Sequence, residues 1–164
     1  MVPVLLLEAA AERGALFHIL AAAHAKKLWT TTEITPEVEG YFKSFTLWWK
    51  KAVVKVLMSE PSPPLFHPLW KYHGTPDFVG ILRGSEDIVL VDWKLGVREQ
   101  GWRLQLAAYR ELCRANDLMP QRVGVLQPDP SGKRMASFID MTATMDDDFK
   151  VFRCALTVWR FFNE

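Results

Sequence analysis

The chain of 164 residues has the composition of a folded globular protein. Hydrophobic residues make up 49% and charged residues 24%, a balance that excludes an intrinsically disordered chain. We expect a single domain over residues 1–164, long enough to bury a core. No apolar run reaches the roughly 18 residues of a membrane span, so no membrane partner is expected. The net charge of +1 does not by itself indicate a nucleic-acid partner.

The N-terminal segment is apolar but lacks the basic residues that begin a signal peptide. Glu8 and Glu12 follow the apolar patch directly, so we interpret it as the start of a helix. Cys113 and Cys154 lie in apolar helical contexts, which favours buried thiols in a reducing cytosol. The expected location is therefore cytoplasmic.

Two helices are predicted in the first third of the chain. Residues 7–28 space their apolar side chains as an amphipathic helix does. A second helix is expected from Pro36, with Thr35 as its N-cap, to about Val53. Its aromatic residues are predicted to pack in the core. Lysines crowd this half of the chain, and we interpret them mainly as solvated helix faces.

β-structure is predicted next. A strand is expected over residues 54–60, ended by the proline cluster at 61–68. Strands are expected in the runs 72–84 and 87–96, and the turn between them begins at Gly84. These two runs therefore predict a hairpin.

The last part of the chain alternates between helix and strand. A helix is predicted over 100–116, followed by strands within 122–129 and 134–140. A final helix is expected over 145–162, with Thr144 as its N-cap.

The predicted order α-α-β-β-β-α-β-β-α indicates an α/β fold. A strand-helix-strand unit beside an antiparallel hairpin calls for a crossover connection. We therefore expect a mixed central β-sheet flanked by helices. Phe138, Trp159, Phe161 and Phe162 are expected to cover the core, with a subunit contact as the alternative.

Asp77, Asp92 and Lys94 form the most informative constellation, because the hairpin would bring them together. Asp92 and Lys94 are two residues apart, so their side chains emerge on one face of the strand. Charges that follow a buried strand are costly unless they are paired or bind a metal. Two converging carboxylates suit Mg²⁺ or Mn²⁺, and a lysine can orient the attacking water. An ordinary ion pair between Asp92 and Lys94 is the structural alternative.

The flanking residues add three further elements in a fixed order. Gly74-Thr75-Pro76 precedes the first acid, and Gln105 and Tyr109 share one face of the next helix. With Gly14-x-x-x-His18 in the first helix, the arrangement resembles the RecB-like branch of the PD-(D/E)XK nuclease superfamily. The resemblance spans roughly residues 12–115.

This resemblance implies a restriction-endonuclease-like core and a role for each matching residue. Asp77 and Asp92 are then metal-binding carboxylates, Lys94 is the catalytic lysine and His18 is an additional metal ligand. Gln105 and Tyr109 support the site and contact DNA. Glu60 is a further candidate, and a solvated strand end is its plainer interpretation.

The implied activity is that of a free-standing exonuclease that hydrolyses phosphodiester bonds at DNA ends with one or two Mg²⁺ or Mn²⁺ ions. Such a domain would act in recombination, repair or phage DNA processing, in a bacterial or phage-infected cell. A recombination or single-strand-annealing protein is a candidate partner. Two cysteines are too few for an iron–sulfur cluster, so none is expected. A non-catalytic DNA-binding or assembly module and a structure-specific endonuclease are the alternatives.

Overall fold

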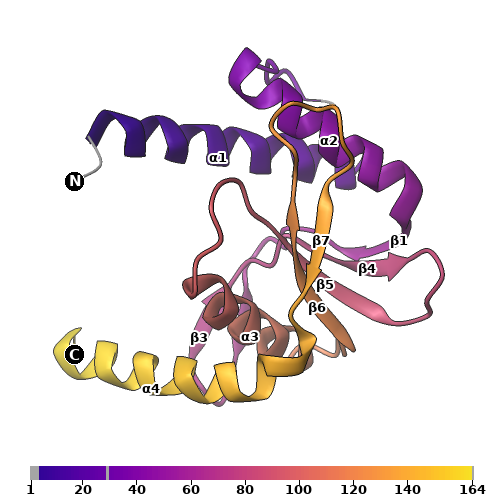
Figure 1. The fold of residues 1–164 in the computed structure, drawn as a ribbon. Coiled ribbons are helices and arrows are strands. Elements are labelled where there is room, and N and C mark those ends of the chain that lie inside the picture. Colours follow the sequence, from indigo (N-terminus) through magenta and orange to yellow (C-terminus); the bar gives the residue numbers. More distant parts are fainter. Residues whose placement is uncertain (1–3, 29, 164) are drawn as a thin grey trace.

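The computed structural model describes residues 4–28 and 30–163, and its chain path is shown in Figure 1. The helices are α1 (Val4–Ala25), α2 (Pro36–Ala52), α3 (Gly101–Arg114), the 3₁₀ turn η1 (Thr142–Thr144) and α4 (Met145–Asn163). The strands are β1 (Val53–Met58), β2 (Leu65–His67), β3 (Tyr72–Gly74), β4 (Phe78–Leu82), β5 (Ile88–Trp93), β6 (Arg122–Gln127) and β7 (Ser137–Asp140).

Five strands form one mixed sheet in the order β1-β4-β5-β6-β7. The β1–β4, β4–β5 and β6–β7 pairs are antiparallel, whereas β5 and β6 run parallel and are connected through α3. The predicted α/β class and the mixed sheet flanked by helices are therefore confirmed. The strands β2 and β3 form a separate hairpin that packs against α3.

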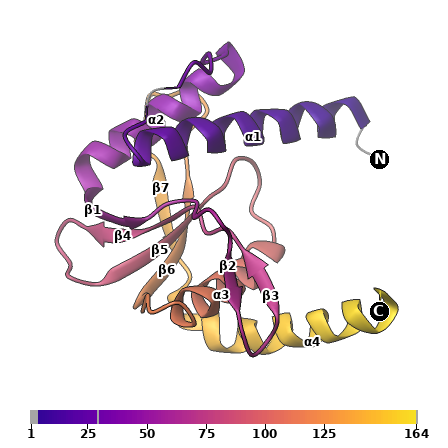
Figure 2. The same ribbon diagram turned by 180° about the vertical axis from the view of Figure 1, so that it is seen from behind.

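The two faces of the sheet carry separate apolar clusters. Figures 1 and 2 show α1 and α2 over one face, and α3 with α4 on the other side. Val91 and Trp93 of β5 pack with the α1–α2 cluster, while Leu90 packs with the α3 cluster. Successive side chains of a strand point to opposite faces. Asp92 therefore belongs to the α3 side, between two residues that face α1 and α2.

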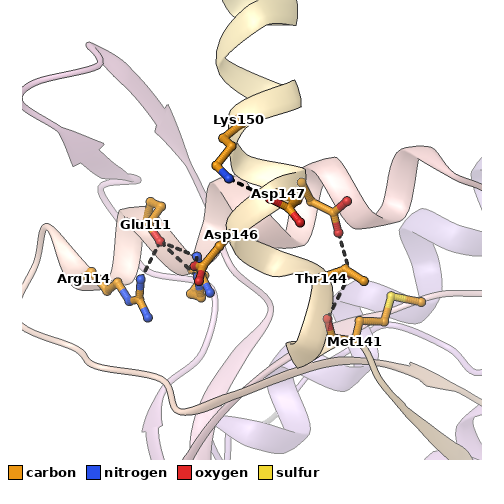
Figure 3. Close-up of polar contacts among 9 residues, drawn as sticks. Glu111, Arg114, Met141, Thr144, Asp146, Asp147 and Lys150 are labelled. Carbon is orange, nitrogen blue, oxygen red and sulfur yellow. Dashed lines mark hydrogen bonds and ion pairs between the residues drawn. The ribbon is translucent and has the colours of Figure 1, made fainter.

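The acidic run at the start of α4 is paired with bases. Arg103 of α3 makes two hydrogen bonds to Asp148, at 3.0 and 2.6 Å, and Arg110 of α3 lies 2.6 Å from Asp146. Lys150 pairs with Asp147 one turn further along α4 (Figure 3). Each of the three acids therefore has a basic partner. The pairs with Arg103 and Arg110 join α4 to α3.

Several predicted boundaries shift. The first helix ends at Ala25, and Leu28 lies exposed beyond it, while the second helix ends at Ala52. The predicted strand 54–60 is observed as Val53–Met58, because the backbone of Glu60 turns into the left-handed region at φ 39°. The hairpin β2–β3 was not predicted. β2 lies within the proline cluster at 61–68, and β3 is the start of the run 72–84, which the structure divides into β3 and β4.

The end of the last helix contradicts two expectations. Trp159, Phe161 and Phe162 are 62%, 81% and 77% exposed, so they do not cover the core; Phe138 does pack against it. Cys154 is exposed as well, whereas Cys113 is buried. The second half of α4 extends past α3 and the sheet (Figure 1), and Arg160 there donates to the carbonyls of Trp70 and Lys71 in the β2–β3 turn.

Thr144 also differs from its predicted role as an N-cap. It belongs to the 3₁₀ turn before α4, and its hydroxyl donates to the Asp148 carboxylate at 2.7 Å (Figure 3). Thr35 does occupy the N-cap position of α2, with an extended backbone. Among the residues that the structure describes, no helix combines the length and apolar character required to cross a membrane.

Candidate active site

Asp77 and Asp92 meet at one edge of the sheet because of the β4–β5 register. Phe78 pairs with Val91, so the antiparallel ladder places Asp77, one residue before β4, opposite Asp92 near the end of β5. Both carboxylates are buried, at 6% and 1% exposure. The predicted convergence of the two acids is therefore present in the structure.

Three neighbouring groups orient Asp77. The backbone N–H of Trp93 donates to its Oδ2 at 2.7 Å, and the Ser59 hydroxyl donates to its carbonyl oxygen at 2.8 Å. His18 Nδ1 lies 3.2 Å from Oδ1 of the same carboxylate. Both oxygens of the carboxylate thus have a fixed direction, one toward the sheet and one toward α1.

His18, Glu60 and Asp77 form the tightest group of potential metal ligands. One ligand atom from each lies within 4.8 Å of the others, and His18 Nδ1 is 3.9 Å from the Glu60 carboxylate. These three side chains come from α1, the segment after β1 and the residue before β4. Two carboxylates and an imidazole at this spacing are a ligand set for a divalent cation.

The backbone around Glu60 is held in an uncommon conformation. Its φ of 39° is in the left-handed region, which non-glycine residues rarely adopt. The Glu60 N–H donates to the Pro76 carbonyl at 3.1 Å, and Lys26 Nζ donates to the Glu60 carbonyl at 2.9 Å. These contacts turn the side chain toward Asp77, where a regular strand would have continued.

Electrostatics in this group favour a cation. Burial and the charge of Asp77 raise the pKa of Glu60 above its usual range. Burial acts to lower the pKa of His18, but the hydrogen bond and charge of Asp77 outweigh it and raise that pKa. A divalent ion would relieve the repulsion between the carboxylates and would compete with the proton for His18.

Asp92 begins a chain of polar contacts on the α3 side of the sheet. Its Oδ2 lies 2.7 Å from Lys94 Nζ, which donates to Gln105 Oε1 at 2.8 Å; Gln105 Nε2 donates to the Tyr109 hydroxyl at 3.0 Å. The structure therefore brings all four predicted residues into contact. Gln105 and Tyr109 lie one helical turn apart on α3, as their spacing predicts.

Asp92 does not belong to the His18–Glu60–Asp77 ligand group. Its Oδ2 is buried, and within the described residues Lys94 is the one cation close to it; no other donor bonds that oxygen. Burial and the charge of Asp77 raise the pKa of Asp92 to about 7, although Lys94 acts in the opposite direction. The carboxylate is thus poorly compensated by this protein alone.

Ser59 and Lys26 were not identified as site residues from the sequence. A serine before Glu60 has no distinguishing pattern, and Lys26 was one of many lysines in its half of the chain. His67 and His73 were assigned no role, and neither belongs to the ligand group.

Comparison with protein-family models finds no match, and comparison with curated proteins finds none either. The function is therefore inferred from the geometry around Asp77 and Asp92.

Proposed function

We propose that this protein is a divalent-metal-dependent DNA nuclease with a PD-(D/E)XK, restriction-endonuclease-like core, which acts as an exonuclease at DNA ends. The observation that carries the proposal is the meeting of Asp77, Asp92 and Lys94 at one sheet edge. His18 and Glu60 complete a ligand group beside them.

The donor chemistry fits Mg²⁺ or Mn²⁺, as one or two ions. His18, Glu60 and Asp77 would hold a cation, and the buried carboxylate of Asp92 would contribute to the same site. An imidazole among carboxylates favours Mn²⁺ over Mg²⁺, because nitrogen ligands suit the softer ion better. The bound ion would supply Lewis-acid activation of the phosphate and a lowered pKa for the attacking water.

Lys94 would act on the substrate in this proposal. Its ammonium group has three donors, of which Asp92 and Gln105 receive two. The third donor is available for a water molecule or a phosphate oxygen. Gln105 and Tyr109 hold the lysine in position, so the charge of Lys94 faces the carboxylates and can offset charge that builds up on the phosphate.

The preference for DNA ends, and a recombination or single-strand-annealing protein as partner, rest on the resemblance to RecB-like nucleases. Cytoplasmic action in a bacterial or phage-infected cell rests on the same resemblance. A role limited to DNA binding and an endonuclease activity are the outcomes that the following assay separates.

The test is a cleavage assay on end-labelled linear DNA and covalently closed circular DNA, with Mg²⁺, Mn²⁺ or EDTA. We expect the wild-type protein to degrade only the linear DNA and only with metal. Lys94→Ala should reduce the rate by at least 100-fold, because charge stabilisation at phosphorus is lost. Opening of the circular DNA would indicate an endonuclease.

Lys133→Ala is the matched control, because this lysine is exposed and lies in the turn between β6 and β7. It should cleave at the wild-type rate. Wild-type protein that binds DNA ends but cleaves nothing with either metal would contradict the proposal and favour a binding module.

A further inference from the structure

The outer edge of β1 has no partner strand among the described residues. β1 is the first strand in the sheet order and pairs with β4 alone, and in Figure 2 it follows directly from α2. Within the part of the chain that the structure describes, no backbone hydrogen bond outside the β1–β4 ladder involves residues 54–58. The polar backbone groups along this edge are therefore open to an added strand.

A groove of about 750 Å³ follows this edge, between residues 23–28 at the end of α1, Trp49 of α2 and residues 53–56 of β1. We call it the β1 groove. Successive side chains of a strand point to opposite faces, so a groove lined by four consecutive residues lies along the backbone edge rather than over one face. Four residues at about 3.3 Å each give about 13 Å of edge, enough to pair with a short extended peptide.

The lining of the β1 groove combines apolar and basic side chains. Leu28 and Val54 are 62% and 60% exposed, and Trp49 lies beside them in the lining. Lys27 and Lys55 also line the groove, and no aspartate or glutamate is among its lining residues. Within the described residues, neither lysine forms an ion pair with a carboxylate. Exposed apolar groups beside uncompensated positive charge indicate a binding surface for a partner that is both apolar and acidic.

Lys27 occupies a backbone position that favours glycine. The Leu28 N–H donates to the Ala23 carbonyl at 2.9 Å and the Lys27 N–H to the His24 carbonyl at 3.2 Å, the bonds of a Schellman motif that ends α1. Lys27 has a φ of 54°, in the left-handed region where glycine has no steric penalty. A lysine at this position costs stability and places a positive charge at the groove, which suggests a use for that charge.

The same features argue against two other occupants. A second copy of this edge would bring lysine against lysine, and the β1–β4 register is irregular at two places, which discourages self-pairing. The phosphate backbone of a nucleic acid would use the lysines, but neither the unpaired strand edge nor the apolar lining. An acidic peptide in an extended conformation uses all three features.

We propose that the β1 groove binds an extended acidic segment of a partner protein, which adds a sixth strand to the sheet. Alternate apolar side chains of the segment contact Trp49 and Val54, and its acidic side chains lie beside Lys27 and Lys55. None of these four residues has a part in the metal and lysine chemistry described above. Peptide binding therefore does not depend on the proposed nuclease function.

The first experiment selects ligands from a random dodecapeptide library displayed on phage, with the immobilised wild-type protein in EDTA. We expect the enriched peptides to carry an excess of aspartate and glutamate, alternating with β-branched or aromatic residues. Enrichment of no peptide, or of peptides without an acidic excess, would overturn the proposal.

The second experiment measures the affinity of an enriched peptide, labelled with fluorescein, by fluorescence anisotropy. Lys55→Glu should weaken binding at least tenfold, because the reversed charge repels the acidic peptide. Lys133→Glu is the matched control, since Lys133 is equally exposed but lies in the turn between β6 and β7. It should bind the peptide as the wild type does.

Lys27→Gly provides a variant whose fold is not at risk. Glycine suits the left-handed backbone at this position, so the variant should melt no lower than the wild type. Loss of the charge should weaken peptide binding at least threefold. Wild-type affinity in both Lys55→Glu and Lys27→Gly would show that the peptide binds elsewhere and would overturn the proposal.

The third experiment tests whether the peptide adds a strand. Alternate residues of an added strand direct their backbone N–H groups toward β1, and the residues between them direct theirs away. Two versions of the peptide therefore carry N-methyl groups on one or the other alternate set. One version should lose binding and the other should keep it. Equal affinity of the two versions would exclude strand addition.

A duplex DNA probe in EDTA separates the peptide from a nucleic acid as the occupant of the β1 groove. Lys55→Glu should bind this DNA as the wild type does. DNA binding that falls in Lys55→Glu while peptide binding is unchanged would assign the groove to nucleic acid and overturn the proposal. All of these readouts are made without metal or cleavage. Lys55-dependent peptide binding in a protein that cleaves no DNA would refute the nuclease function alone.

Discussion

The aromatic cluster beneath α2 and the polar edge around Asp92 are adjacent regions built on opposite principles. In the aromatic cluster, the rings of Phe45, Trp48 and Trp93 pack against one another, with ring centres 5.3 to 6.5 Å apart. Asp92, the residue before Trp93, is equally buried, but Lys94 is the one partner of its buried Oδ2 among the described residues.

The first region contributes to stability, whereas the second is suited to binding a ligand. Rings in the first region lose water and gain contacts, so burial stabilises the folded state. Carboxylates in the second region lose water without full compensation, so burial destabilises it. Such a region is retained when a ligand supplies the missing partner, as a bound cation would for these carboxylates. Four measurements test this contrast.

The largest effect is expected for Phe45→Ala. Phe45 is fully buried and contacts rings from α1, α2 and β5, so its truncation leaves a cavity in the core. The free energy of unfolding should fall by about 3–5 kcal/mol. Urea denaturation followed by tryptophan fluorescence measures it. A loss below about 1 kcal/mol would show that the cluster is not the core of the protein.

The polar edge should respond to metal instead. Mn²⁺ at 100 times its dissociation constant should stabilise the folded protein by about 2.7 kcal/mol, because it binds the folded state alone. Asp77→Asn should abolish this gain, as measured by melting temperature with and without EDTA. Asp147→Asn, an exposed acid paired with Lys150, serves as control and should keep the gain. Equal stabilisation of both variants would argue against the proposed ligands.

Asp92→Asn should stabilise the metal-free protein at pH 8. The pKa of Asp92 is about 7, above its ordinary value of 3.8, so the folded state favours the protonated form. The stabilisation that the folded state gains from protonated Asp92 is complete below about pH 4 and is lost as the pH rises through 7. The variant stays neutral, so its melting temperature in EDTA should exceed that of the wild type at pH 8. The difference in melting temperature between the variant and the wild type should narrow at pH 5. A difference that is the same at pH 5 and pH 8 would exclude titration of Asp92 as its cause.

The smallest effect is expected at the end of α4. Phe161→Ser should change the free energy of unfolding by no more than about 0.5 kcal/mol, because the ring is 81% exposed. Urea denaturation of this variant and of Phe45→Ala compares the loss of a phenylalanine ring in two environments. A loss above 1 kcal/mol would show that the tail of α4 is buried in solution.

Much of this architecture follows from local sequence patterns. The valine-rich run before Asp92 indicates a strand buried on both faces, and β5 is one. A two-residue spacing puts Asp92 and Lys94 on one side, and a four-residue spacing does the same for Gln105 and Tyr109; both pairs are in contact. Periods of two and 3.6 residues are properties of the backbone, so they can be read without knowing the fold.

Features of the site that depend on residues distant in the sequence are decided only by the tertiary structure. Glu60 joins His18 and Asp77 because its backbone turns at a positive φ and Lys26 holds its carbonyl, contacts that no local pattern encodes. Phe161 and Phe45 are the same residue type in similar helices, yet one is exposed and the other is buried. Composition makes a side chain apolar, but only the length and position of the opposing elements determine whether a surface covers it.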